Sequence, residues 1–150
     1  MRALRSLLIV LCSTMVYCAQ AGEPPETAVA MVEKGAAFLK ANGREALLKE
    51  VNSKSAEFIQ GEVYLLVRAA DGTILAHPIN PRLVGKNMNE LPDADGKYFR
   101  KEIVEIARTK GKGWVDYRYN NPLSKEIEKK SSYFVRNGEL ILEAGIYKGK

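Results

Sequence analysis

Apolar side chains in the first third of the chain recur at the three- and four-residue spacing of a helix. The residues that share this face are Val29, Val32, Ala36 and Leu39. The pattern predicts a long helix over 27–41, with Thr27 as its N-cap. Asn42 and Gly43 interrupt the pattern, and a second, shorter helix is predicted to end near Asn52.

From Gly61 onward, short apolar runs separated by turn residues predict strands. Residues 63–70 and 73–77 are predicted to be two strands joined by Asp71–Gly72, a dipeptide typical of two-residue hairpin turns. Residues 80–92 are rich in proline, glycine and asparagine, so they are predicted to form a long irregular loop.

The rest of the chain predicts one further helix and three strands. Asp93 or Asp95 is expected to cap the helix, and Gly111 is expected to end it. The apolar face of this helix consists of Phe99, Ile103, Ile106 and Ala107. The three strands are 113–119, 130–136 and 139–147, and Asn137–Gly138 is the hairpin signal between the last two.

This order of elements indicates an α+β domain built on one antiparallel sheet. The long N-terminal helix is expected to cover one face of the sheet. The 80–92 loop and the short helix that follows it are expected to cover the other face. A sheet face that is partly roofed by a loop is a natural place for a small ligand cavity.

The first 21 residues have the organisation of a secretory signal peptide. Two arginines precede an apolar run at 6–19, and Ala19-Gln20-Ala21 forms a small-x-small cleavage site. Cleavage after Ala21 would leave 22–150 as a single domain in the periplasm or outside the cell. The apolar run is short for a membrane span, which needs roughly 20 residues, so a retained anchor is the weaker alternative.

Removal of the signal peptide changes what the composition implies. Both cysteines, Cys12 and Cys18, lie in it, so the mature chain has no cysteine for disulfides, thiolate catalysis or metal binding. The signal peptide also contains two of the 23 basic residues, which leaves 21 against 18 acidic residues and a net charge of +3. These basic residues are interspersed with acidic ones, so no nucleic-acid partner is expected.

The sequence lacks the common motifs of enzymes and cofactor sites. It contains no Gly-x-Ser-x-Gly, no phosphate-binding glycine loop and no His-Glu-x-x-His. One histidine without a mature cysteine excludes a metal site rich in these residues, and Asp-Ala-Asp-Gly at 93–96 lacks the full spacing of a calcium loop. The sequence therefore predicts neither catalysis nor a cofactor or metal.

Five short motifs occur in an order that is typical of one known family. The motifs are LAHPINPRLVGKNM (75–88), DADGKYF (93–99), GKGWVDYRYNNP (111–122), KSSYF (130–134) and AGIYK (144–148). In this order and spacing the chain resembles the Cache family of extracytoplasmic sensor domains, in its single-module form. The resemblance implies a PAS-like five-stranded antiparallel sheet behind a long helix, with a pocket for a small organic ligand, commonly a short carboxylate.

Lys130 is the residue to which the resemblance points most directly. In KSSY it lies where the family's Lys-x-Ser-Tyr motif has its lysine, and an ammonium group is a compact partner for an anion. A solvated surface lysine is the alternative. Tyr117 and Tyr133 could each donate a hydroxyl to a carboxylate oxygen or simply pack in the core. Trp114 is either a core plug or a pocket wall, and Tyr64 is expected on the ligand side by strand alternation.

His77, the only histidine, lies where a predicted strand must end, because Pro78 follows it and lacks a backbone donor. If the loop roofs the cavity, the imidazole stands at its entrance as a hydrogen-bond donor. With an ordinary pKa of roughly 6.5, His77 could carry a positive charge beside an anion. The alternative is a strand-end histidine that bonds a nearby backbone carbonyl.

Together these features predict an exported small-molecule-binding domain of the sensor type, whose ligand is a short organic carboxylate. Family members usually lie between two membrane spans of a chemoreceptor or sensor kinase. This sequence ends after the domain, which favours a free ligand binder. A membrane receptor or kinase partner and a homodimer through the N-terminal helix are further expectations. The alternative from another class is a secreted interaction or assembly protein with a vestigial pocket.

Overall fold

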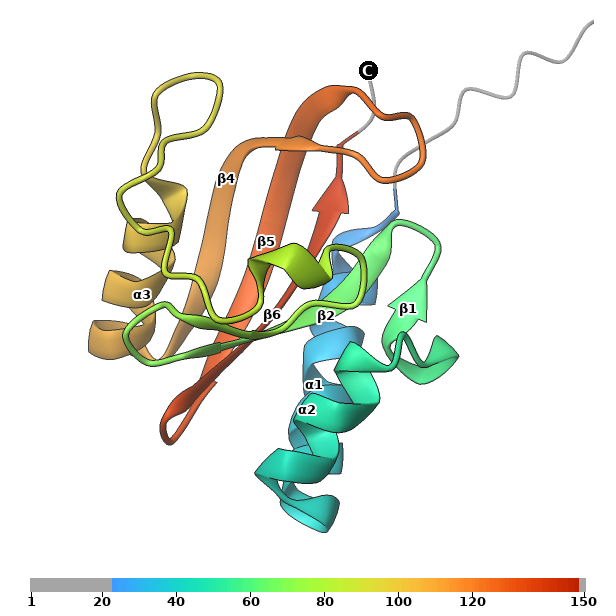
Figure 1. The fold of residues 1–150 in the computed structure, drawn as a ribbon. Coiled ribbons are helices and arrows are strands. Elements are labelled where there is room, and N and C mark those ends of the chain that lie inside the picture. The colour runs from blue at the N-terminus through green and yellow to red at the C-terminus, as the bar shows by residue number, and fades with distance from the viewer. Residues whose placement is uncertain (1–22, 149–150) are drawn as a thin grey trace, which may run out of the picture.

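The computed structural model describes residues 23–148, so the predicted signal peptide and its cleavage site lie outside the described residues. Figure 1 shows one sheet with helices packed on both of its faces. In chain order the elements are α1 (Pro25–Asn42), α2 (Arg44–Asn52), η1 (Ala56–Phe58), β1 (Ile59–Gln60), β2 (Val63–Ala69), β3 (Ile74–Ala76), η2 (Pro81–Leu83), α3 (Phe99–Lys110), β4 (Lys112–Asn120), β5 (Ile127–Asn137) and β6 (Leu140–Tyr147). No helix within the described range is long and apolar enough to cross a membrane.

The sheet is antiparallel throughout, which confirms the predicted α+β class. Its strand order is β1-β2-β6-β5-β4, and β3 pairs with the C-terminal part of β2, off this order. The sheet has six strands in the described residues, whereas five were predicted. The additional strand is β1, whose two residues are too few to show a period-two pattern in the sequence.

Both helix starts differ from the sequence-based expectation. Helix α1 begins at Pro25 and its N-cap is Pro24, not Thr27. Proline suits the first helical position because its missing N–H would have no partner there. Helix α3 begins at Phe99 without a side-chain cap, so neither acidic residue of the 93–96 segment caps it.

The acidic segment before α3 instead fastens a loop to the edge strand β4. Asp93 Oδ1 accepts the backbone N–H groups of Asp95 and Lys97 at 2.9 and 2.8 Å. Its other oxygen accepts the backbone N–H of Arg118 in β4 at 2.8 Å. These three N–H donors hold the pKa of Asp93 below its usual value. The carboxylate therefore pairs one backbone N–H that the edge strand β4 leaves open and two N–H groups of the loop.

Strand alternation gives the two faces of the sheet different environments. On β2, Val63, Leu65 and Val67 face α1 and α2, while the residues between them face α3 and the long loop. The core under α1 and α2 consists of Ala28, Met31, Val32, Leu47, Val51, Phe58, Val63, Leu65, Val67, Ala76, Leu140, Leu142, Ala144 and Ile146. Because both faces are covered, β2 and β6 are apolar along most of their length.

Helix α3 covers only the β4–β5 side of the opposite face. Its Phe99, Ile103 and Ala107 pack against Val115 and Phe134, and the αL conformation of the following glycine ends the helix as predicted. The segment between β3 and α3 crosses the rest of this face, as the yellow-green trace in Figure 1 shows. The predicted arrangement, with the long helix on one face and a loop and short helix on the other, is confirmed.

Candidate ligand-binding site

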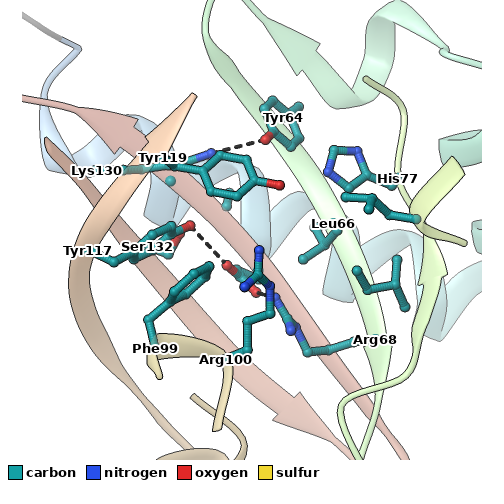
Figure 2. Close-up of a pocket in the computed structure, with 15 residues that line it drawn as sticks. Tyr64, Leu66, Arg68, His77, Phe99, Arg100, Tyr117, Tyr119, Lys130 and Ser132 are labelled. Atoms are coloured by element: carbon teal, nitrogen blue, oxygen red, sulfur yellow. Dashed lines mark hydrogen bonds and ion pairs between the residues drawn. The ribbon is translucent and has the colours of Figure 1, made fainter. Parts of the chain in front are cut away.

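A small cavity lies on the face of the sheet that α3 and the long loop cover (Figure 2). Strands β2, β4, β5 and β6 form its floor, and residues 74–83 with the first turn of α3 form its walls. The space open to the centre of a water molecule is about 20 Å³, room for roughly one water. Within the described range, no group of three or more His, Cys, Asp or Glu side chains could hold a metal ion.

Four charged side chains line the cavity, and all of them are buried. The exposed fraction is 2% for Arg68, 7% for Arg100, 3% for Lys130 and 3% for Glu143. Three cations and one carboxylate give this lining a net charge of +2. Burying a charge without a counter-ion is costly. An anion in the cavity would offset this excess of positive charge.

Arg68, on β2, is paired on one side only. Its Nη2 forms a buried ion pair with Glu143 Oε2 of β6. Its Nε and Nη1 are buried and have no hydrogen-bond partner among the described residues. Tyr117 donates to the second oxygen of Glu143 at 3.5 Å, and its hydroxyl lies 2.8 Å from Ser132 Oγ. Both carboxylate oxygens of Glu143 thus have hydrogen-bond partners, whereas two N–H groups of Arg68 have none among the described residues.

Lys130, on β5, lies among tyrosine side chains. Its Nζ donates to the hydroxyls of Tyr64 and Tyr147 at 3.1 and 3.4 Å, and Figure 2 shows it directed at Tyr64. No carboxylate in the described part of the chain lies within ion-pair distance of it. Burial lowers the pKa of Lys130 to about 8, against the opposing effect of the Glu143 charge.

Gly145 on β6 makes room for the lysine stem. A Cβ atom at this position would lie 2.6 Å from Lys130 Cε and 2.5 Å from Ser132 Oγ. These separations are well below van der Waals contact. The glycine of the AGIYK motif is therefore needed because a side chain there would displace Lys130. The motif alone did not reveal this role.

Aromatic rings contact Arg100, the third buried cation of the lining. Phe99 stacks on Tyr117 with ring centroids 3.8 Å apart and planes 5° apart. The guanidinium of Arg100 lies 4.1 Å from the Phe99 centroid, and its Nη1 donates to the Leu91 carbonyl at 3.2 Å. Arg100 therefore reaches the cavity from the first turn of α3 and also ties the long loop to that helix.

His77 lines the cavity, but its hydrogen bonds differ from the expected ones. Its Nδ1 accepts the backbone N–H groups of Ile79 and Asn80 at 3.3 and 3.1 Å. The contacts of Nδ1 are therefore with backbone N–H groups rather than with a backbone carbonyl, and the proton is assigned to Nε2 because Nδ1 acts as an acceptor. Burial, with the nearby Lys130 charge, lowers the pKa of His77 to about 4. The imidazole is therefore neutral at pH 7 in the ligand-free protein, and a positive charge on His77 beside a bound anion stays a prediction.

The pKa of His77 predicts an acid-sensitive contribution to stability. Between pH 6.5 and 4 the unfolded chain binds a proton at His77 that the folded protein does not bind. The free energy of unfolding should therefore fall as the pH falls through this window, by on the order of 3 kcal/mol. Urea unfolding at pH 7.0, 5.5 and 4.5 measures it, and His77→Gln should lose this component of the slope. Equal pH dependence in both proteins would contradict the assignment.

The structure brings four of the six predicted site residues together. Tyr64, His77, Tyr117 and Lys130 line the cavity.

Trp114 and Tyr133 do not line the cavity and lie on the other face of the sheet. They are cross-strand partners with ring centroids 5.2 Å apart, and Trp114 is 38% exposed. Tyr133 packs against the core under α1. The pair Tyr117 with Lys130, both of which line the cavity, lies three residues along the ladder. Because side chains alternate along a strand, an odd separation places the two pairs on opposite faces.

Sequence reasoning missed Arg68, Arg100, Tyr119 and Glu143. A signal existed for two of them, since Arg68 interrupts the apolar run VYLLVRA and Glu143 interrupts LILEAGIY. A lone charge inside an otherwise buried strand indicates a paired or functional group. Arg100 had no such signal, because a basic residue next to lysine on an amphipathic helix usually faces solvent.

Comparisons with known proteins agree with this geometry. The model of the family "single Cache domain 2" matches residues 26–139. The methyl-accepting chemotaxis protein McpP of Pseudomonas putida is 29% identical over 86 residues, which are 56% of this chain and 16% of that protein. The chain thus corresponds to a small part of this curated relative.

Two solved structures share both the fold and part of the sequence. A periplasmic sensor domain of a chemotaxis protein superposes with a TM-score of 0.65 and 27% identity, over 81% of this chain and 88% of that one. A Cache chemosensory domain, studied for carboxylic acid recognition, gives a TM-score of 0.63 and 26% identity, over 81% and 86%. The fold, the buried cavity and the family match over most of the chain lead to one conclusion: the chain belongs to the single Cache domain 2 family of ligand-binding sensor domains.

Proposed function

We propose that the cavity binds a short organic carboxylate and that the protein is an exported sensor domain for this ligand. The observation that carries the proposal is the buried charge of the lining, three cations against one carboxylate. Two donors of Arg68 have no partner among the described residues. A carboxylate would supply both the missing negative charge and the missing acceptors.

The lining also suggests how such a ligand would lie. Lys130 and Arg68 would provide the charge, and the Nε2–H of His77 would provide a neutral hydrogen bond. Leu66, Ile74 and Leu83 form an apolar wall that suits a short aliphatic tail. The space holds roughly one water as it stands, so even a short carboxylate would need part of the wall to move.

Two further considerations support this function. One relative of similar fold is a Cache domain studied for carboxylic acid recognition. The relatives are sensor domains of chemotaxis proteins rather than enzymes, so we propose binding without chemical conversion. The alternative of a vestigial pocket fits less well. Three buried cations beside one carboxylate cost folding free energy, and without a ligand nothing would offset that cost.

The output of the domain follows from its family. We propose that ligand binding is read by a chemoreceptor or sensor kinase in the membrane, with the domain in the periplasm or outside the cell. The predicted homodimer through α1 stays a prediction, and sedimentation of the purified protein with and without ligand measures it.

A thermal-shift screen tests the proposed function. Formate, acetate, propionate, butyrate and pyruvate would be compared with the matched alcohols and amines at pH 7. At a hundredfold excess over the dissociation constant, a ligand should stabilise the protein by about 2.7 kcal/mol, a rise in Tm of about 10 °C for a domain of this size. Only carboxylates should give this rise. Equal stabilisation by alcohols, or none by any carboxylate, would refute the proposal.

A further inference from the structure

A second, larger hollow lies next to the cavity. It has a volume of about 270 Å³ and is bounded by Ile79, Asn80, Asn120, Pro122 and Lys125, from the turn after β3 and the loop between β4 and β5. We call it the outer cleft and the smaller space of about 20 Å³ the inner cavity. The two spaces share three lining residues, Tyr64, His77 and Tyr119. These three side chains therefore form the partition between them.

Two of the three partition residues are held firmly. Tyr64 lies on the inner strand β2, is buried, and accepts a hydrogen bond from Lys130 at 3.1 Å. His77 accepts two backbone N–H groups and is followed by a proline that restricts its backbone. Moving either side chain would break buried hydrogen bonds, which is costly.

Tyr119 is held differently. It lies one residue before the end of β4, which pairs with β5 alone, and it is half-buried. Its ring makes edge contacts with Phe99 and Tyr117, at centroid distances of 6.1 and 5.9 Å. The guanidinium of Arg100 lies 5.8 Å from its centroid. Figure 2 shows the Tyr119 ring in front of Lys130. Lys130 Nζ lies 5.3 Å from the same centroid, and the Tyr119 hydroxyl interacts with the Arg100 side chain. Rotation of the Tyr119 side chain would disturb these side-chain contacts but no backbone pairing.

The inner cavity has room for roughly one water, so a carboxylate can enter it only if a wall moves. We infer that Tyr119 is the movable wall, that it limits ligand length, and that the outer cleft accepts the tail of longer aliphatic carboxylates once this wall is withdrawn. The inference rests on the proposed function. The outer cleft suits an aliphatic stem, since Ile79, Pro122 and the tyrosine rings provide apolar surface beside its amides.

Tyr119→Ala joins the two spaces and tests the inference. Calorimetric titration with acetate, butyrate and hexanoate would give the ratio of the hexanoate to the acetate dissociation constant. In the variant this ratio should fall by about tenfold or more relative to wild type, because the tail gains an apolar site. Tyr119→Leu keeps more of the packing and should shift the ratio in the same direction, so the test does not depend on the folding of one variant.

Trp114→Ala is the matched control, since it removes an aromatic ring from the same strand on the opposite face. It should leave the ratio as in wild type. Ile79→Ala in the Tyr119→Ala background should weaken hexanoate binding and spare acetate. An unchanged ratio in both Tyr119 variants, with acetate still bound, would overturn this inference alone. A wild-type protein that binds no carboxylate would overturn the proposed function and this inference together.

Discussion

Replacing Lys130 with methionine is expected to weaken carboxylate binding by about 30-fold to several thousandfold. The ammonium is buried among tyrosines, without a carboxylate of the described chain in ion-pair distance. Removing one partner of a buried charged contact costs roughly 2–5 kcal/mol. The methionine keeps the aliphatic stem, so the fold should survive. Calorimetric titration with the carboxylate found in the screen measures the loss, and urea unfolding checks the stability.

The neighbouring lysine provides the control. Lys129 is exposed and lies on the opposite face of β5, so Lys129→Met should change the affinity by no more than about twofold. In wild type, the affinity should also decline above pH 8, because the free protein loses the Lys130 charge near its pKa of about 8. Binding by Lys130→Met at wild-type affinity would show that the anion site is misplaced.

Replacing Glu143 with glutamine is expected to destabilise the folded protein by about 3–5 kcal/mol at neutral pH. The substitution leaves the guanidinium of Arg68 buried without its counter-ion, and two of its donors have no partner among the described residues. Glutamine has nearly the same shape as glutamate, so packing changes little. The midpoint of urea unfolding, with an unchanged m-value, measures the loss.

A double substitution separates charge from packing in this prediction. Arg68→Met with Glu143→Leu replaces the whole ion pair by apolar side chains, which should recover most of the stability that Glu143→Gln loses. The same double variant should bind the carboxylate poorly, since it lacks one of the two proposed cations. Wild-type stability of Glu143→Gln would mean that Arg68 does not depend on this partner.

The parts of the fold that depend on near neighbours were predicted well. The turn signals Asp71–Gly72 and Asn137–Gly138 join the strands that they were expected to join. The long N-terminal helix follows from local apolar spacing. Errors arose where local patterns are ambiguous. Strand β1 is two residues long, and Asp93 binds the backbone of β4, 25 residues away, rather than capping the helix beside it.

The candidate site was predicted less completely, because its members come from distant parts of the chain. Lys130 and Tyr64 are 66 residues apart in sequence, and Arg68 and Glu143 are 75 residues apart. Lys130 was predicted from the family resemblance, and Tyr64 from the alternation of side chains along a strand. The family resemblance and the alternation of side chains could not predict which face of the sheet holds Trp114 and Tyr133. That depends on how strands β4 and β5 are placed in the sheet.

The sequence by itself determined the helices, the hairpins and the α+β class, since these depend on backbone preferences and on apolar periodicity between near neighbours. Only the tertiary structure decided the charge and tautomer of His77, the burial of three cations beside one carboxylate, and the partition by Tyr119. These properties arise from desolvation and from distances between atoms that the chain brings together only when it folds. The candidate ligand site is therefore a property of the packed sheet face, to which strands β2, β4, β5 and β6 contribute their residues.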